Sequence, residues 1–229
     1  MPRTSRSMET MEGKQTSRNR KSLLLLGLVG AIAAAFYIFP PFRVVSLEEA
    51  KRKTATEHFN PKEFSERFWN ERLLKSLDHA VDAATLVAAI DQNPENAKRQ
   101  YGRQLGLSSV YYYFAKGEGR IVAINHNEIV LELSGARSNT DLMLVTANVS
   151  GNAVRDATGL IDVNSFPNSR EFNQIATELN QRVEATVLPP FRQQAVVGAT
   201  VMFVGCVQIE DEANDLHPLK LIPIQASIK

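Results

Sequence analysis

The spacing of apolar and polar residues changes several times along this chain of 229 residues, and each change predicts a different element. From Leu23 to Phe39 there are 17 consecutive residues without a charge. A helix of that length covers roughly 25 Å, which is just enough to cross a bilayer. Pro40 and Pro41 follow and end it, because proline removes a backbone donor. We therefore expect a transmembrane signal anchor over residues 22–41.

Residues 42–106 predict a helical segment. Asparagine followed by proline occurs at Asn60–Pro61 and at Asn93–Pro94, a pattern that is typical of a helix cap and the first helical position. Between these signals, apolar residues recur at steps of three and four from Phe64 to Ala88, which predicts one buried stripe. The second signal predicts a shorter helix that ends at Gly106.

Residues 107–229 contain short runs rich in β-branched and aromatic residues, which predict strands. A tight turn is expected at Gly117–Gly119, between the first two runs. About three strands precede an amphipathic helix that Asn168 and Glu171 open as a capping box and Pro189–Pro190 end, and two strands follow it. This order predicts an α+β fold with a small OB-like antiparallel β-barrel and one helix between strands three and four. Other α+β folds share the order.

The net charge of +1 conceals an asymmetry, because residues 1–21 hold six basic and two acidic residues. The positive-inside rule places this basic tail in the cytoplasm and the domain after it on the periplasmic side of the inner membrane, with a single pass. The remainder of the chain is mildly acidic, which argues against a nucleic-acid partner. Two alternatives for the apolar run are a buried core helix and a signal peptide cleaved after Ala35.

We find no sequence motif for catalysis, metal binding or cofactor binding. Cys206 is the single cysteine, so an intramolecular disulfide is excluded, and its surroundings predict a buried strand residue. The sequence Gly117–Gly119 lacks the third glycine of a dinucleotide fingerprint. The histidines are scattered singly, which favours no metal site: they are His58, His79, His126 and His217. We expect no catalytic residue, no metal and no cofactor.

The densest polar cluster follows the expected third strand. Arg155 and Asp156 precede Asn164 and Asn168, and together these side chains offer a guanidinium fork and paired amide groups suited to a carboxylate or a sugar hydroxyl. They are the candidate ligand-binding residues. The alternative is structural: the arginine pairs with the aspartate, and the asparagines cap turns and helices. Tyr111–Tyr113 offers either an aromatic platform or, by strand alternation, a mixture of core and surface residues.

Several stretches together resemble a bacterial family of predicted periplasmic lipoproteins of unknown function, often encoded beside sugar ABC-transporter genes. They are FNPKEFSERFWNERLLKSL, NAKRQYGRQLG, YYYFAKGEGRIV, AVRDATGLIDVNSF and VVGATVMFVG, in the order of the family, and the resemblance covers about residues 42–226. Phe42 stands where relatives place a lipidated cysteine, so we expect the uncleaved apolar helix to anchor the protein instead. Ser169 and Arg170 also depart from the family pattern.

The resemblance implies an OB-like domain and brings no established reaction or ligand. We expect a non-enzymatic accessory or binding protein linked to sugar or solute uptake, with the membrane and components of a sugar ABC transporter, or its solute-binding protein, as partners. The alternatives are an envelope enzyme acting on glycans, for which no acid and base stand at a suggestive spacing, and a structural scaffold that oligomerises.

Overall fold

The computed structural model describes residues 59–229, except residues 107, 136–141 and 167. The expected cytoplasmic tail (1–21) and signal anchor (22–41) lie outside the described residues. Among the helices that are described, none is both long enough and apolar enough to cross a membrane.

The first helix, α3 (Pro61–Phe68), begins as predicted, because the Asn60 side chain accepts a hydrogen bond from the backbone N–H of Glu63. It continues into one π-helical turn, η1 (Trp69–Leu73), and then ends. The predicted single stripe from Phe64 to Ala88 is therefore wrong. Its two halves belong to separate helices that pack into separate parts of the core.

The break has a local cause that the apolar spacing conceals. A 3-10 turn, η2 (Leu77–His79), leads into a short strand, β1 (Val81–Asp82), and the Asp82 side chain then caps a new helix, α4 (Ala83–Gln92). Its carboxylate oxygen lies 2.8 Å from the Thr85 backbone nitrogen. A new helix, capped by Asp82, therefore begins within the region that the periodicity predicts as one helix.

The second capping signal is confirmed, since Asn93 caps α5 (Pro94–Tyr101) through the backbone N–H of Asn96. This helix ends at Tyr101 rather than at the predicted Gly106. The chain turns into a short strand, β2 (Arg103–Gln104), before that glycine.

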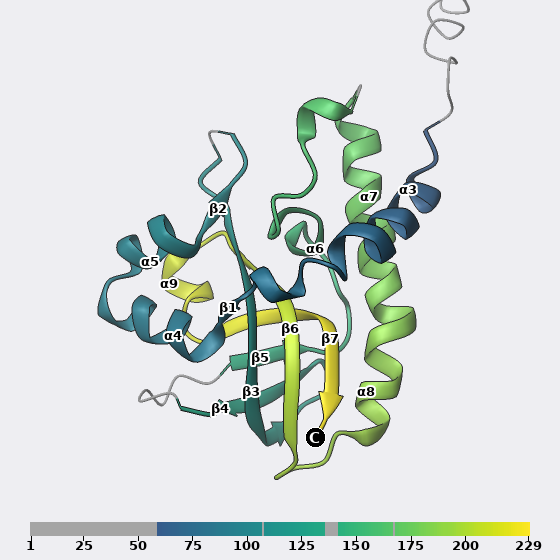
Figure 1. The fold of residues 1–229 in the computed structure, drawn as a ribbon. Coiled ribbons are helices and arrows are strands. Elements are labelled where there is room, and N and C mark those ends of the chain that lie inside the picture. Colours follow the sequence, from purple (N-terminus) through teal and green to yellow (C-terminus); the bar gives the residue numbers. More distant parts are fainter. Residues whose placement is uncertain (1–58, 107, 136–141, 167) are drawn as a thin grey trace, which may run out of the picture. The chain divides into compact units, whose positions relative to one another are not determined.

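Five longer strands form a circuit of pairings in the order β3-β4-β5-β7-β6, and β6 pairs back onto β3 (Figure 1). All neighbours in the circuit are antiparallel except β5 and β7, which are parallel. The predicted fully antiparallel arrangement is therefore wrong at this pair. The strands are β3 (Tyr111–Ile124), β4 (Glu128–Leu133), β5 (Leu142–Val145), β6 (Thr200–Ile209) and β7 (Leu219–Ile228).

Strand β3 is continuous, so the turn predicted at Gly117–Gly119 is wrong. Gly117 pairs with Phe203 of β6, and a Cβ atom at Gly117 would lie 3.0 Å from the Phe203 ring. The glycine is thus required by the close approach of an aromatic ring and not by a change of chain direction.

The segment between β5 and β6 is helical, in the predicted position between the third and fourth of these five strands in chain order. It contains α6 (Ala153–Asp156), the 3-10 turn η3 (Val163–Ser165), α7 (Ser169–Arg182), the π-helical turn η4 (Val183–Val187) and α8 (Leu188–Gln194). The helix does not end at Pro189–Pro190 as predicted, because these prolines occupy the first turn of α8, where no backbone donor is needed. A short helix, α9 (Glu212–Asp215), joins β6 to β7.

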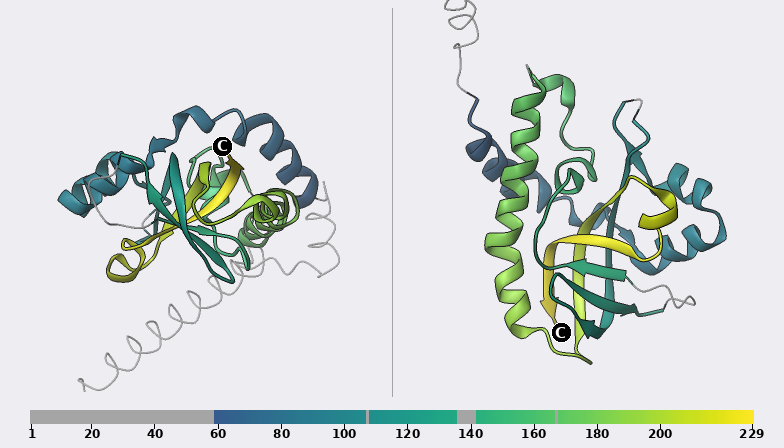
Figure 2. Two further views of the ribbon diagram at one scale, coloured as in Figure 1. Left: turned by 90° about the horizontal axis from the view of Figure 1, so that it is seen from below. Right: turned by 180° about the vertical axis from the view of Figure 1, so that it is seen from behind.

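Two hydrophobic clusters form the core. The inner cluster draws buried residues from all five strands of the circuit, from α4, α5 and α8, and from Leu216 after α9, for example Leu131, Leu144 and Val201. The outer cluster joins the opposite face of β3, β6 and β7 to α3, η1, α6 and α7, for example Phe114, Trp69 and Leu179. Figures 1 and 2 show α4, α5 and α9 on one side of the strands and α3, α7 and α8 on the other.

Strand β6 crosses β7 closely at Gly205, where a Cβ atom would lie 2.1 Å from Leu221 Cδ2. The pairing register shifts between Val204 and Gly205, which marks an irregularity that bends the strand. The neighbouring Cys206 is fully buried in β6, as the sequence predicts.

Candidate functional site

Two of the predicted ligand-binding residues, Arg155 and Asp156, meet in α6 and bind each other. Arg155 Nε lies 2.6 Å from Asp156 Oδ1, and Nη2 lies 2.8 Å from Oδ2, so the pair is bidentate. The residues are only 3% and 2% exposed. The remaining donor, Nη1, bonds the Phe172 carbonyl oxygen at 3.0 Å and Asn173 Oδ1 at 3.2 Å. The guanidinium also lies 3.6 Å from the Phe172 ring centroid, so protein groups surround it.

The Asp156 carboxylate also acts on two neighbouring side chains of the sheet. Burial, followed by the negative charge of Asp156, raises the pKa of Tyr112 to about 12. The same two causes raise the pKa of the Cys206 thiol above its ordinary value. Both groups therefore stay protonated at neutral pH, which suits a buried structural centre rather than a reactive one.

The other two predicted residues, Asn164 and Asn168, do not reach this pair. Asn164 bonds Asp162 through its backbone nitrogen and its side chain, at 2.9 and 3.0 Å. Asn168 caps α7 as predicted, since its Oδ1 accepts from the Glu171 backbone N–H at 3.0 Å. The reciprocal half of the predicted capping box differs, because Glu171 Oε1 accepts from the Asn168 side-chain amide at 3.1 Å and not from its backbone N–H. Each of the four residues thus has partners within the protein, and their role in ligand binding stays a prediction.

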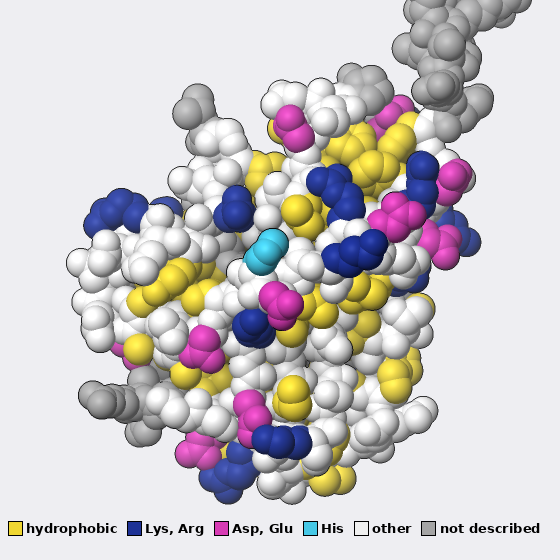
Figure 3. Space-filling model, viewed as in Figure 1, with side chains coloured by type: hydrophobic (Ala, Val, Ile, Leu, Met, Phe, Trp, Pro, Cys, Tyr) yellow, Lys and Arg dark blue, Asp and Glu magenta, His cyan; other side chains and the backbone are white. Residues whose placement is uncertain are grey.

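A polar pocket of about 210 Å³, here called the Arg103 pocket, lies beside the segment that follows α6. Three parts of the chain that are distant in sequence form its walls: the turn before β1, the junction of α5 with β2, and the loop after Asp156. Its lining residues are Ser76, His79, Val81, Gln100, Tyr101, Arg103, Phe114, Ala157, Thr158 and Leu160. Figure 3 shows Lys and Arg side chains and one His on the surface between β2 and α3.

The loop at Gly159 shapes the wall beside Arg103. Gly159 has φ of +64°, and a Cβ atom there would lie 2.8 Å from Arg103 Nη1. The Gly159 N–H donates to the Asp156 carbonyl oxygen at 3.0 Å, so the buried ion pair and the pocket wall belong to one short segment. A second arginine, Arg72, donates to the Leu160 carbonyl oxygen at 2.6 Å.

The polar groups of the Arg103 pocket are largely unused by the protein. Within the described part of the chain, the side chains of Arg103, His79 and Gln100 form no hydrogen bond or ion pair. The Ser76 hydroxyl, in contrast, donates to the Leu73 carbonyl oxygen at 2.8 Å, and the Thr158 hydroxyl accepts from the Leu160 backbone N–H at 3.3 Å. No carboxylate lines the pocket, and buried Phe114 supplies an apolar surface. The arrangement offers donors to a small polar molecule.

Sequence reasoning missed this pocket, because its residues come from separate predicted elements. Arg103 and His79 show no spacing relation that links them. Asp-Ala-Thr-Gly at Asp156–Gly159 is a turn signal that marks one wall, although it does not say which side chain lies opposite.

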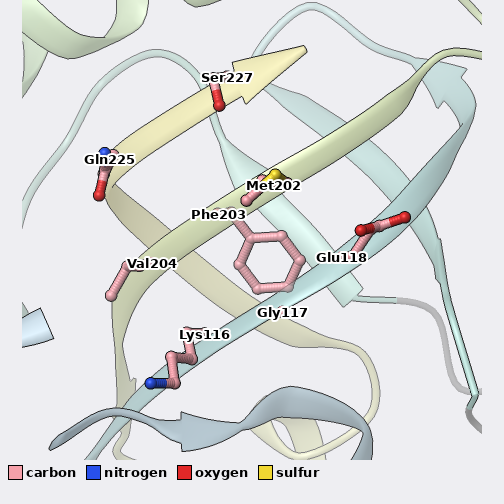
Figure 4. A pocket seen from close by; sticks show the side chains of 8 residues that line it. All are labelled: Lys116, Gly117, Glu118, Met202, Phe203, Val204, Gln225 and Ser227. Atoms are coloured by element: carbon pink, nitrogen blue, oxygen red, sulfur yellow. The ribbon is translucent and has the colours of Figure 1, made fainter. Parts of the chain in front are cut away.

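A second hollow, the sheet-face groove, lies on the outer face of β3, β6 and β7 and has a volume of about 280 Å³ (Figure 4). Its charged groups are paired: Lys116 Nζ donates to the Asp78 carbonyl oxygen at 3.0 Å, and Lys229 Nζ lies 3.0 Å from Glu118 Oε2. Met202 is 50% exposed beside them. The groove is mainly apolar and offers fewer free polar groups than the Arg103 pocket.

The tyrosines of β3 are buried and do not form an aromatic platform at the surface. Tyr111 and Tyr113 face the inner cluster, and Tyr112 faces the outer one, as strand alternation predicts. The rings of Tyr111 and Tyr113 meet edge to face with centroids 5.4 Å apart. Across the described residues, no group of three or more His, Cys, Asp or Glu side chains is placed to hold a metal ion.

The protein is an α+β domain, and its fold is similar to that of a solved OB-fold protein. An OB-fold protein from Thermotoga maritima, known from a crystal structure at 1.90 Å resolution, is similar at 28% identity and a TM-score of 0.67. The similarity covers 76% of this chain and 100% of that one. The chain belongs to the DUF2291 family, described as predicted periplasmic lipoproteins, which it matches over residues 32–227. Comparison with curated proteins found no match.

Proposed function

We propose that this protein is a membrane-anchored, non-enzymatic accessory of the periplasm that holds a small polar solute in the Arg103 pocket. The observation that supports the proposal is the set of unused donors at Arg103, His79 and Gln100 around an apolar surface. Pockets for small molecules combine apolar walls with a few convergent polar groups in this way. The lining lacks a carboxylate pair, which favours binding over glycan hydrolysis.

The binding test uses the full-length protein in detergent micelles and a panel of pentoses, hexoses and their acid and phosphate derivatives. A solute at a hundred times its Kd raises the unfolding free energy by about 2.7 kcal/mol, which a thermal shift detects. We expect Tyr101→Phe and Thr158→Val to weaken the shift, because both remove a hydroxyl from the pocket. Met202→Gln in the sheet-face groove is the matched control and should leave it unchanged.

Two results would contradict the proposal. One is a panel in which no solute stabilises the protein. The other is a stabilisation that Met202→Gln removes and the two pocket variants leave intact, which would assign binding to the sheet-face groove instead.

For the anchor, we propose that the apolar run Leu23–Phe39 stays uncleaved and replaces lipidation. A family of predicted periplasmic lipoproteins implies an envelope protein held at a membrane, and Phe42 stands where the resemblance expects the lipidated cysteine. Alkaline phosphatase fused after Lys229 should be active, and the protein should stay in the membrane fraction at high salt without incorporating labelled lipid. A soluble product that begins at Phe36 would instead show cleavage.

As partner we propose a component of a sugar ABC transporter or its solute-binding protein. Only the family resemblance supports this step, since fold alone does not carry function. Site-specific cross-linking from Met202, the exposed apolar side chain of the sheet-face groove, should trap such a component in native membranes. Cross-linking solely to unrelated envelope proteins would count against it.

A further inference from the structure

The charges around the Arg103 pocket have one sign. Arg103 and His79 are the ionisable side chains of basic type in the lining, which contains no Asp or Glu. Two acidic residues that precede lining residues in the chain have other partners: Asp156 pairs with Arg155 in α6, and the side chain of Asp78 lies 4.0 Å from Lys116 Nζ. The site is therefore positive and lacks an internal counter-charge.

Neighbouring elements bring further basic side chains near the pocket. Arg72 lies against the pocket wall through its bond to the Leu160 carbonyl oxygen. On α5, Arg99 bonds the Asn96 side chain, and Lys98 pairs with Glu212 at 2.8 Å on the α9 side. An anion that enters the pocket would therefore meet the Arg103 guanidinium without displacing a carboxylate, and Arg72 would add positive charge behind the wall.

The position of Arg103 suits a directional contact. Its guanidinium lies along the backbone of Gly159, with Nη1 2.8 Å and Cδ 3.0 Å from the point where a Cβ atom would stand. A bulkier residue at position 159 would push the side chain away. Arginine presents planar paired donors that match a carboxylate or a phosphate, and here those donors have no partner in the protein.

We propose that the Arg103 pocket recognises the anionic group, a carboxylate or a phosphate, of a small hydroxylated solute. This inference rests on the proposed binding function and specifies its ligand class. Arg103 binds the acid group. The hydroxyls of Tyr101 and Thr158 and the amide of Gln100 face the hydroxylated part of the solute, and Phe114 contacts its apolar face.

The experiment compares each acid with its neutral twin by calorimetric titration of the full-length protein in detergent. The probes are gluconate against glucose, ribose 5-phosphate against ribose, and inorganic phosphate alone, so that carboxylate, phosphate and free anion are distinguished. We expect one acid to bind at least about ten-fold more tightly than its neutral twin, since a charge-assisted bond contributes more than a neutral one. Added salt should lower the affinity for the acid and leave the affinity for the neutral sugar unchanged.

The key variant is Arg103→Gln, which should lower the affinity for the acid to that of its neutral twin and leave binding of the neutral twin intact. Arg103→Lys keeps the charge and loses the fork, so we expect it to restore part of the advantage. Arg99→Gln on α5 removes one positive charge outside the pocket and is the matched control. Circular dichroism of each variant checks that it is folded.

The outcomes separate the two proposals. Equal binding of acid and neutral twin, unaffected by Arg103→Gln, overturns the anion assignment and leaves the binding function standing. Binding of inorganic phosphate that Arg99→Gln weakens as much as Arg103→Gln also overturns it, because the effect is then general electrostatics. Binding of neither twin by the folded wild-type protein overturns the binding function, and the anion assignment with it.

Discussion

Two arginines beside one short segment differ in whether the protein itself uses their donors. Arg155 is buried, and its donors bond Asp156, Phe172 and Asn173. Arg103 lines the Arg103 pocket beside Gly159 and has no partner among the described residues. The comparison shows that the presence of an arginine does not by itself indicate whether its side chain bonds the protein or is free to bind a ligand. Burial and the use of its donors within the protein decide between them.

The largest effect should follow from Arg155→Ala, which leaves Asp156 as a buried charge without its partner. We expect a loss of more than about 3 kcal/mol of unfolding free energy. The measurement is urea unfolding followed by the fluorescence of Trp69, the single tryptophan, which is 5% exposed in the same outer cluster.

The control for this prediction is the double variant Arg155→Ala with Asp156→Ala, which should recover much of the loss because no unpaired charge remains. A single variant within about 1 kcal/mol of wild type would contradict the structural role of the pair and favour the ligand role predicted from the sequence.

Gly159→Ala should have an intermediate effect on the unfolding free energy and should also displace Arg103. The backbone at φ +64° is strained for any residue with a Cβ atom, so we expect a loss of about 1–2 kcal/mol. Gly106→Ala, at φ +58° with open space around the new Cβ atom, measures the strain alone. Only Gly159→Ala should also weaken binding of the acid, because its Cβ atom displaces Arg103. Equal binding by both variants would show that Arg103 does not contact the ligand.

Asn168→Ala should remove a helix cap and cost about 1 kcal/mol, with no change in solute affinity. Its side chain faces Glu171 at the start of α7 and does not line the Arg103 pocket. Thermal unfolding and titration of the same sample measure both quantities. A loss of affinity without a loss of stability would restore this residue to the candidate site.

The smallest effect on stability should come from Arg103→Gln, within about 0.5 kcal/mol of wild type, as for other substitutions of exposed side chains without partners. Chemical unfolding under the conditions used for Arg155→Ala gives a direct comparison. A loss above about 1 kcal/mol would mean that Arg103 holds the Gly159 loop in place, and the contrast between the two arginines would then fail.

Local signals in the sequence were reliable where one short segment supplies all the interacting groups. The caps at Asn60, Asn93 and Asn168 each bond the backbone N–H three residues later, so residue type and spacing determine them. Strands β6 and β7 follow the helical segment, in the predicted order, and each contains a run of buried residues.

Interactions between distant segments decided what the sequence left open or predicted wrongly. The ring of Phe203 explains why a glycine is needed at position 117 within a strand, and the return of β7 beside β5 makes that pair parallel. The Arg103 pocket likewise exists only because three segments meet around Phe114. The sequence by itself thus determined the caps, the helix between the third and fourth strands and the two final strands. Only tertiary structure decided pairing and the pocket, because both depend on side chains that no local spacing relates.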